Sequence, residues 1–225
     1  MGLSEPGFYH VQECVPNQDC ILAGTVNNYR VAVLADGVST CRCSGQGAFL
    51  ACSKTRSFLL NNAEDIFEYD KESIAEYIVD SVYRSLCEAS NVNGDNPADY
   101  SSTLSAVLYD RKSHQLVCFH LGDGLILLAN RKGCRALCIP GSRINGTAVT
   151  TTVGAHKVSV VVKADAASEK HVLLCSDGAW ENMYRKGFLK NEPLKYITKG
   201  RFNALDNYIR NTNPKDDYSY IAMKL

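Results

Sequence analysis

Short apolar segments separated by turn signals run along much of the chain. Two of them, Cys20–Val26 and Val31–Ala35, flank the pair Asn27-Asn28, which favours a tight hairpin turn. The second segment contains no polar residue, a pattern typical of a strand that is buried on both faces. Further segments predicted to be strands are Thr103–Tyr109, Gln115–His120, Leu125–Ala129, Lys157–Lys163, Lys170–Ser176 and Ser219–Leu225.

Helical periodicity is concentrated between these groups of strands and near the end of the chain. Gly45–Leu60 carries apolar residues at helical spacing, and a second helix is predicted to follow a capping Asp70, with an apolar stripe up to Ala89. Shorter helices are predicted over Glu181–Leu189 and Phe202–Arg210. Strands, then two helices, then many strands favour an α+β fold with helices on the outer faces of antiparallel sheets.

Length and charge narrow the possible classes of protein. The 225 residues predict one domain over 1–225, with a Gly-, Ser- and Thr-rich surface flap near 140–155. Lys and Arg number 24, as do Asp and Glu, so no global field would attract nucleic acid or an anionic membrane. No apolar run is long enough to span a membrane, and the first residues lack a secretory signal pattern, so we expect a cytoplasmic protein.

Acidic residues stand where several of the predicted strands end. Three of them are each followed directly by glycine, which would place a carboxylate at the rim of a sheet: Asp36, Asp123 and Asp177. One Asp-Gly step is an ordinary turn, but three of them, together with Asp19 and the pair Asp216-Asp217 beside other strands, favour a shared site. Clustered carboxylates repel one another, and oxygen ligands suit Mg²⁺ or Mn²⁺.

The order of these motifs resembles that of the metal-dependent Ser/Thr protein phosphatases of the type 2C (PPM) family, in particular its small bacterial-type branch. The matching segments are NQDC at 17–20, VAVLADG at 31–37, SSTLSAVLYD at 101–110, FHLGDGLILL at 119–128, VLLCSDGAWENM at 172–183 and DDYSYIAMKL at 216–225. They follow the family order and cover nearly the whole chain. The resemblance implies a β-sandwich of two antiparallel sheets flanked by helices on both outer faces.

The resemblance also implies the ligands of two ions, Mn²⁺ or Mg²⁺. These would be Asp36 with the carbonyl of Gly37, Asp177 and Asp217, and the three carboxylates are the expected catalytic residues. Strand alternation favours Asp217 over its neighbour Asp216, because Asp217 shares the parity of the more apolar face of the last strand. Asp19 would hold metal-bound water, and a looser third metal site found in some members would use Asp123 and Glu181.

The implied activity is hydrolysis of phosphoserine and phosphothreonine in proteins by a metal-activated water, opposing a Ser/Thr kinase. Three positions depart from the family pattern: Cys14 replaces the phosphate-gripping arginine, Gln18 replaces an acid, and Val38 replaces a histidine. These departures leave open a second hypothesis, a catalytically weak or inactive phosphatase-like binding module. The substitute cations that could bind phosphate are His10, Arg42 and Arg143.

Overall fold

The strands build two antiparallel sheets that face each other. The structure is a computed structural model, and it describes residues 1–140, 155–185 and 187–225. Sheet A contains, in spatial order, β1 (Gly2–Glu5), β12 (Tyr218–Lys224), β9 (His171–Cys175), β6 (Leu125–Ala129) and β7 (Cys134–Cys138). Sheet B contains β2 (Cys20–Val26), β3 (Tyr29–Ala35), β4 (Leu104–Asp110), β5 (Gln115–Leu121) and β8 (Val160–Asp165).

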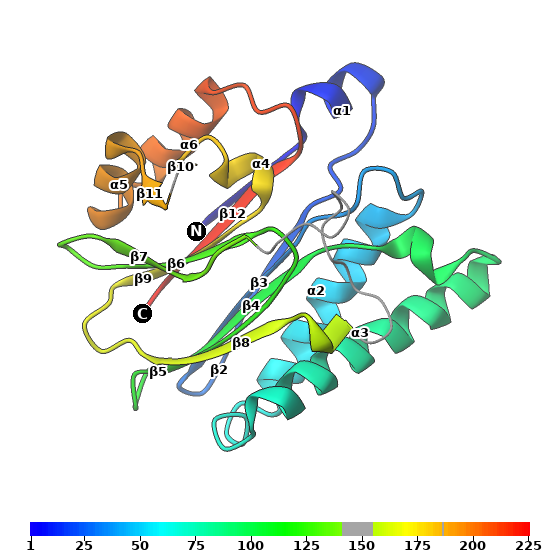
Figure 1. Cartoon of the computed structure of the whole chain (residues 1–225), viewed down its shortest axis with the longest axis horizontal. Coiled ribbons are helices and arrows are strands. Elements are labelled where there is room, and N and C mark those ends of the chain that lie inside the picture. The colour runs from blue at the N-terminus through cyan, green and yellow to red at the C-terminus, as the bar shows by residue number, and fades with distance from the viewer. Residues whose placement is uncertain (141–154, 186) are drawn as a thin grey trace.

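Helices cover the outer face of each sheet (Figure 1). The long helices α2 (Ser44–Asn61) and α3 (Lys71–Asn93) pack on sheet B, and α5 (Asn191–Thr198) and α6 (Phe202–Asn211) pack on sheet A. The remaining described helices are short: α1 (Phe8–Glu13), α4 (Asp177–Trp180), and the 3₁₀ turns η1 (Pro97–Tyr100) and η2 (Ala155–Lys157). The predicted sandwich with helices on both outer faces is therefore confirmed.

The sandwich has three apolar layers, and strand β12 shows how the sequence builds them. Ile221 and Met223 lie in the layer between the two sheets, as the alternation of β12 predicts. Tyr218, Tyr220 and Ala222 have the opposite parity and are buried against α5 and α6. We expected that second set to face outward, but the helices cover it, so both faces of β12 are buried.

One predicted helix is wrong. The segment Glu181–Leu189 is not helical, because α4 ends at Trp180 and a two-stranded hairpin follows, made of β10 (Tyr184–Arg185) and β11 (Phe188–Leu189). Gly187 in its turn has φ +88°, a left-handed conformation that favours glycine and cannot continue a right-handed helix. Of the predicted flap near 140–155, residues 141–154 lie outside the described residues.

In the described part of the chain, the helices are too short or too polar to cross a lipid bilayer.

Candidate metal centre

The carboxylates predicted from sequence come together where three strands meet the connecting segments at one end of the sandwich. Asp36 follows β3, Asp177 follows β9, and Asp216-Asp217 precede β12. β9 and β12 pair antiparallel with Tyr220 opposite Cys175, so the end of one strand lies beside the start of the other. Figure 1 shows α1, α4 and the start of β12 along the upper side of the molecule.

Asp36 and Asp177 form the centre of the cluster. Burial raises the pKa of Asp36 well above its usual range, and the negative charges of Asp19, Asp177 and Asp216 raise it further. Burial also raises the pKa of Asp177 to about 6, with further contributions from Asp123 and Asp216. Because each group acts on the others, these carboxylates share one electrostatic field, and a cation placed among them would relieve the repulsion.

Asp19 supplies an oxygen that the protein leaves without a partner. Its Oδ2 accepts a hydrogen bond from Ser176 Oγ at 3.0 Å, whereas its Oδ1 is buried and has no hydrogen-bond partner among the described residues. Burial raises the pKa of Asp19 to about 7, although hydrogen bonds with Ser219 and Ser176 oppose that shift. A buried carboxylate oxygen without a donor is costly, so it points to a missing cation or proton.

The two adjacent acids before β12 have different surroundings. Asp217 is 3% exposed, and its carboxylate accepts hydrogen bonds from Gly7 N at 2.9 Å, His10 Nδ1 at 2.7 Å and Gln18 N at 2.6 Å. Asp216 is exposed, and its charge raises the pKa values of both Asp36 and Asp177. The carboxylate of Asp217, the expected ligand, is therefore occupied by donors from the N-terminal segment. Its neighbour Asp216 lies near the other acids of the cluster.

A cleft of about 390 Å³ opens beside the cluster, and Asp177 and Asp216 both line it. Glu181, at the end of α4, also lines the cleft, and its negative charge contributes to the raised pKa of Asp177. Lys215 lines the same cleft and adds a positive charge to its wall. The cleft therefore offers acids for a cation and one ammonium group for an anion. Sequence reasoning had ranked Asp216 below Asp217 as a ligand and had not considered Lys215.

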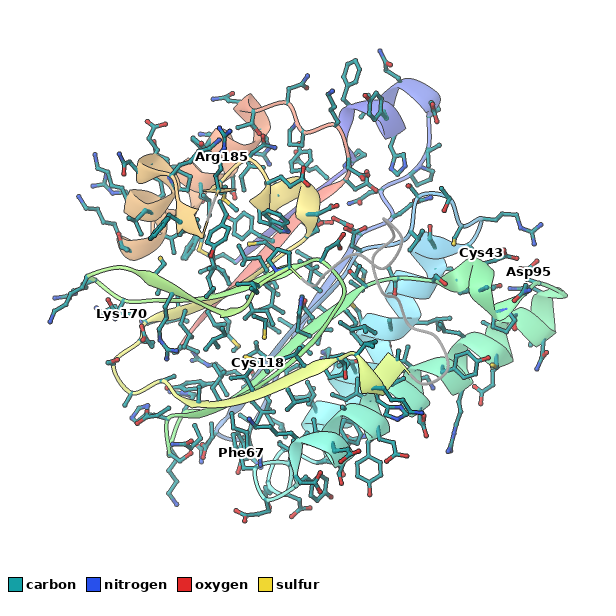
Figure 2. The ribbon with its side chains drawn as sticks, viewed as in Figure 1. Cys43, Phe67, Asp95, Cys118, Lys170 and Arg185 are labelled. Carbon is teal, nitrogen blue, oxygen red and sulfur yellow. The ribbon has the colours of Figure 1, made fainter. Side chains whose placement is uncertain are left out.

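The candidate phosphate-binding cations lie in different places. His10 lies at the cluster, because its ring is bonded to Asp217 and only 12% of its side chain is exposed. Arg42 instead pairs with Asp95, which follows α3, and Figure 2 shows Asp95 beside Cys43 at the far right of the molecule. Arg143 lies outside the described residues. Cys14, in the family's arginine position, is exposed and has a left-handed backbone with φ 56°.

Trp180 connects the cluster to the turn between β5 and β6. Its indole Nε1 donates to the carbonyl oxygen of Asp123 at 2.8 Å, and its ring packs among the apolar residues under sheet A. Asp123 itself is 7% exposed and contributes negative charge to both Asp36 and Asp177. The predicted looser acids thus lie on the Asp177 side of the cluster.

The glycines after Asp36 and Asp177 allow neighbouring segments to approach closely. A Cβ atom on Gly178 would lie 2.2 Å from the carbonyl oxygen of Asp217, and one on Gly37 would lie 2.8 Å from that of Gln18. Neither glycine has a positive φ, so close approach of the neighbouring backbone, and not a left-handed conformation, requires glycine at these two positions. The sequence places glycine where the acid-bearing segments touch.

The donor set fits a hard divalent cation. It consists of carboxylates whose pKa values are raised, mainly by burial, and of one buried oxygen that lacks a partner among the described residues. Among the described side chains, no three His, Cys, Asp or Glu residues are arranged closely enough to chelate an ion without adjustment. The carboxylates would have to rotate toward a shared cation, in the direction that relieves their repulsion.

A two-sheet sandwich with carboxylates at one end and helices on both faces is the architecture of a class of protein phosphatases. The chain belongs to that class: it is a member of the protein phosphatase 2C family, whose sequence model matches residues 6–215. The match includes Asp19, Asp36, Asp123 and Asp177, and it ends directly before Asp216. None of the curated protein sequences compared with the chain matches it.

Solved structures share the fold at low sequence identity. The chain is similar to serine/threonine phosphatase Stp1 from Staphylococcus aureus, with 15% identity, a TM-score of 0.74, and coverage of 100% of this chain and 94% of that one. It is also similar to the catalytic domain of the phosphatase PstP, described in complex with two manganese ions, with 16% identity, a TM-score of 0.72, and coverage of 100% and 97%. RsbX, described in complex with magnesium, has 15% identity, a TM-score of 0.61, and coverage of 100% and 93%.

Proposed function

We propose that this protein is a metal-dependent phosphatase that hydrolyses phosphoserine and phosphothreonine in proteins. The observation that carries the proposal is the group of Asp36, Asp177 and Asp216 in a chain of the phosphatase 2C family, where the charge of Asp216 raises the pKa values of both Asp36 and Asp177. A protein that only bound partners would gain nothing from buried carboxylates that repel one another. Its partners would be phosphorylated proteins and an opposing Ser/Thr kinase, in the cytoplasm.

The residues that would hold two Mn²⁺ or Mg²⁺ ions are Asp36, the carbonyl of Gly37, Asp177 and Asp216. We prefer Asp216 to Asp217 because both carboxylate oxygens of Asp217 already accept hydrogen bonds. Ions held there supply Lewis-acid activation of water and neutralise charge on the phosphoryl group.

Outer residues would support this site. Asp19 has a buried free oxygen and would position water beside the ions. Ser176 holds Asp19 at 3.0 Å and accepts a hydrogen bond from Ser219 N at 2.8 Å, so it fixes Asp19 relative to the start of β12. Asp123 and Glu181 would form a looser third site on the Asp177 side, where both contribute negative charge.

Asp217 would then act as a tether for the N-terminal segment. Its hydrogen bonds to Gly7 N and Gln18 N hold both ends of that segment, and its contact with His10 Nδ1 fixes the imidazole beside the cluster. With Cys14 in place of the family's arginine, Lys215 lines the cleft and His10 contacts the cluster through Asp217. We assign the contacts with substrate phosphate to His10 and Lys215. We do not assign them to Arg42, because Arg42 pairs with Asp95.

The proposal is tested by hydrolysis of an aryl phosphate and of a phosphothreonine peptide, measured with Mn²⁺, with Mg²⁺ and with chelator. We expect metal-dependent turnover of both substrates, abolished by chelator and by Asp177→Asn, and unchanged by Asp165→Asn at the exposed end of β8. Turnover of the aryl phosphate without the peptide would indicate a small-molecule phosphatase. Absence of turnover with either ion, in a protein that folds normally, would favour the inactive binding module instead.

A further inference from the structure

A cavity of about 750 Å³ lies at the end of sheet A opposite to the acid cluster. Four separate segments build its walls: the turn between β6 and β7, the loop before β9, the turn between α5 and α6, and the end of β12. β9 runs from His171 in this cavity toward Asp177, and β12 runs from Asp217 to Lys224 in the cavity. Six residues of extended strand put the two sites about 20 Å apart.

Each of the four segments contributes a cation to the cavity. These are Arg131, Lys170, Lys199 and Lys224, and Figure 2 shows Lys170 at the left edge of the molecule, away from Asp95. Glu169 is the acidic side chain in the lining, and it pairs with Arg135 at 3.3 Å. Within the described residues, none of the four cations forms an ion pair with a carboxylate side chain. The charged side chains of the lining are therefore four cations and one carboxylate, which gives the cavity wall an excess of positive side-chain charge.

His171 lies among these cations and carries an unused polar atom. Its Nδ1 is buried and has no hydrogen-bond partner in the described part of the chain. The ring packs edge-on against Phe202 with centroids 5.1 Å apart, and Gly200, with φ +63°, turns the backbone close to its other side. Burial lowers the pKa of His171, and the charges of Lys224 and Lys170 lower it further, which is consistent with a positive potential in the cavity.

We propose that this cavity binds a small organic phosphate that carries at least two negative charges. Its volume lies within the range of about 300–1,000 Å³ that is usual for small-molecule sites. An arginine fork and several lysine charges are the groups that bind phosphate in proteins. Four cations gathered from separate segments repel one another, and a multiply charged anion would relieve that repulsion. The site is separate from the catalytic acids, and its ligand would contact the far ends of the strands that lead to Asp177 and Asp217.

Calorimetric titration with ATP and with pyrophosphate tests the proposal. Chelator is present throughout, so that no metal ion can attract these anions to the acid cluster. We expect saturable binding that weakens with added salt. The double variant Lys170→Gln/Lys224→Gln should weaken it at least tenfold. As a matched control, Lys190→Gln/Lys195→Gln removes two exposed lysines beside or within α5 that do not line the cavity, and it should bind like the wild type.

Further measurements locate the binding site and define which anions it accepts. Asp177→Asn should bind ATP as the wild type does, which would separate this site from the catalytic one. Thermal unfolding of each variant shows that a loss of binding is not a loss of fold, since the substituted lysines are exposed. The proposal is overturned if ATP and pyrophosphate give no saturable signal at millimolar concentration. It is also overturned if citrate binds as tightly as they do, or if the control variant weakens binding as much as the cavity variant.

Discussion

His10 Nδ1 lies 2.7 Å from Asp217 Oδ1, and this contact joins two residues that are 207 positions apart in the chain. The same carboxylate accepts backbone hydrogen bonds from Gly7 and Gln18. Asp217 therefore fastens the segment that carries α1 to the start of β12. The acid next to it, Asp216, is exposed and lies within electrostatic reach of Asp36 and Asp177. Two neighbouring aspartates thus have separate structural roles.

This division predicts different effects for two substitutions of the same kind. Asp216→Asn should lower metal-dependent kcat/KM by orders of magnitude with little change in stability, because the side chain is exposed. Asp217→Asn should lower the free energy of unfolding by about 1–3 kcal/mol, because an amide cannot serve all three donors as a carboxylate does. Turnover across a Mn²⁺ titration, with denaturant unfolding of each variant, measures both effects. Loss of turnover in Asp217→Asn alone would restore Asp217 as the ligand, in agreement with the sequence expectation.

His10 should contribute to phosphate binding in a way that depends on Asp217. His10→Ala should raise KM for an aryl phosphate several-fold and change kcat less, because it removes a contact in the bound state. A double-mutant cycle with Asp217→Asn measures the coupling between the two residues. Exposed Tyr9, which precedes His10 in α1, offers the control Tyr9→Ala. Additive effects of the two substitutions on KM would show that Asp217 does not position His10.

The metal-free protein should lose stability as the pH rises through neutrality. The pKa of Asp19 is about 7 in the folded protein against 3.8 as its ordinary value, so the folded state binds more protons between these values. The contribution of Asp19 to the free energy of unfolding is fully present below pH 3.8, and it is lost as the pH rises through about 7. His120, whose pKa burial lowers to about 4, acts with the opposite sign, but only below its ordinary value of 6.5.

The thermal unfolding midpoint measured from about pH 6.5 to pH 8.5, with chelator, follows the loss of stability from Asp19 together with that from Asp36, whose pKa is also raised. We expect the midpoint to fall over that range, and to fall less in Asp19→Asn, which does not titrate. Mn²⁺ should raise the midpoint most at the alkaline end, where the carboxylates are ionised. A midpoint that rises with pH in the metal-free protein would contradict the raised pKa of Asp19.

Gly178 should not tolerate even a methyl group. Gly178→Ala would place Cβ 2.2 Å from the backbone oxygen of Asp217, so α4 or the start of β12 would have to move. We expect a loss of about 1–3 kcal/mol in unfolding free energy together with reduced turnover. Gly133→Ala is the control, since nothing lies within 4 Å of the added atom. Equal unfolding midpoints for the two variants would show that this contact does not hold the site together.

Much of the fold follows from local sequence patterns. The predicted strand Cys20–Val26 coincides with β2, and the helix predicted over Gly45–Leu60 lies within α2, because each segment carries its own periodicity. The short elements were not predicted. β1 has four residues, and α1 has six residues and buries none of them, so no apolar pattern marks them. Their positions depend on contacts with β12, at the other end of the chain.

The candidate site also combines residues that the sequence predicts with contacts that it does not predict. Asp36 and Asp177 were predictable because each follows its own apolar strand and is followed by a glycine. The distinction between Asp216 and Asp217 was not predictable from alternation alone. The parity of β12 is right for Ile221, but it does not show that the N-terminal segment supplies three hydrogen-bond donors to Asp217. A contact spanning 207 positions leaves no local signal.

Direct binding of Mn²⁺ to the metal-free protein tests the central claim, that the acid cluster is a metal site. Calorimetric titration compares the wild type with Asp36→Asn and with Asp165→Asn, an acid at the exposed end of β8. We predict saturable binding by the wild type and by Asp165→Asn, and at least tenfold weaker binding by Asp36→Asn. Binding by Asp36→Asn that is as tight as wild-type binding, or no Mn²⁺ binding by the folded wild-type protein, would contradict the account.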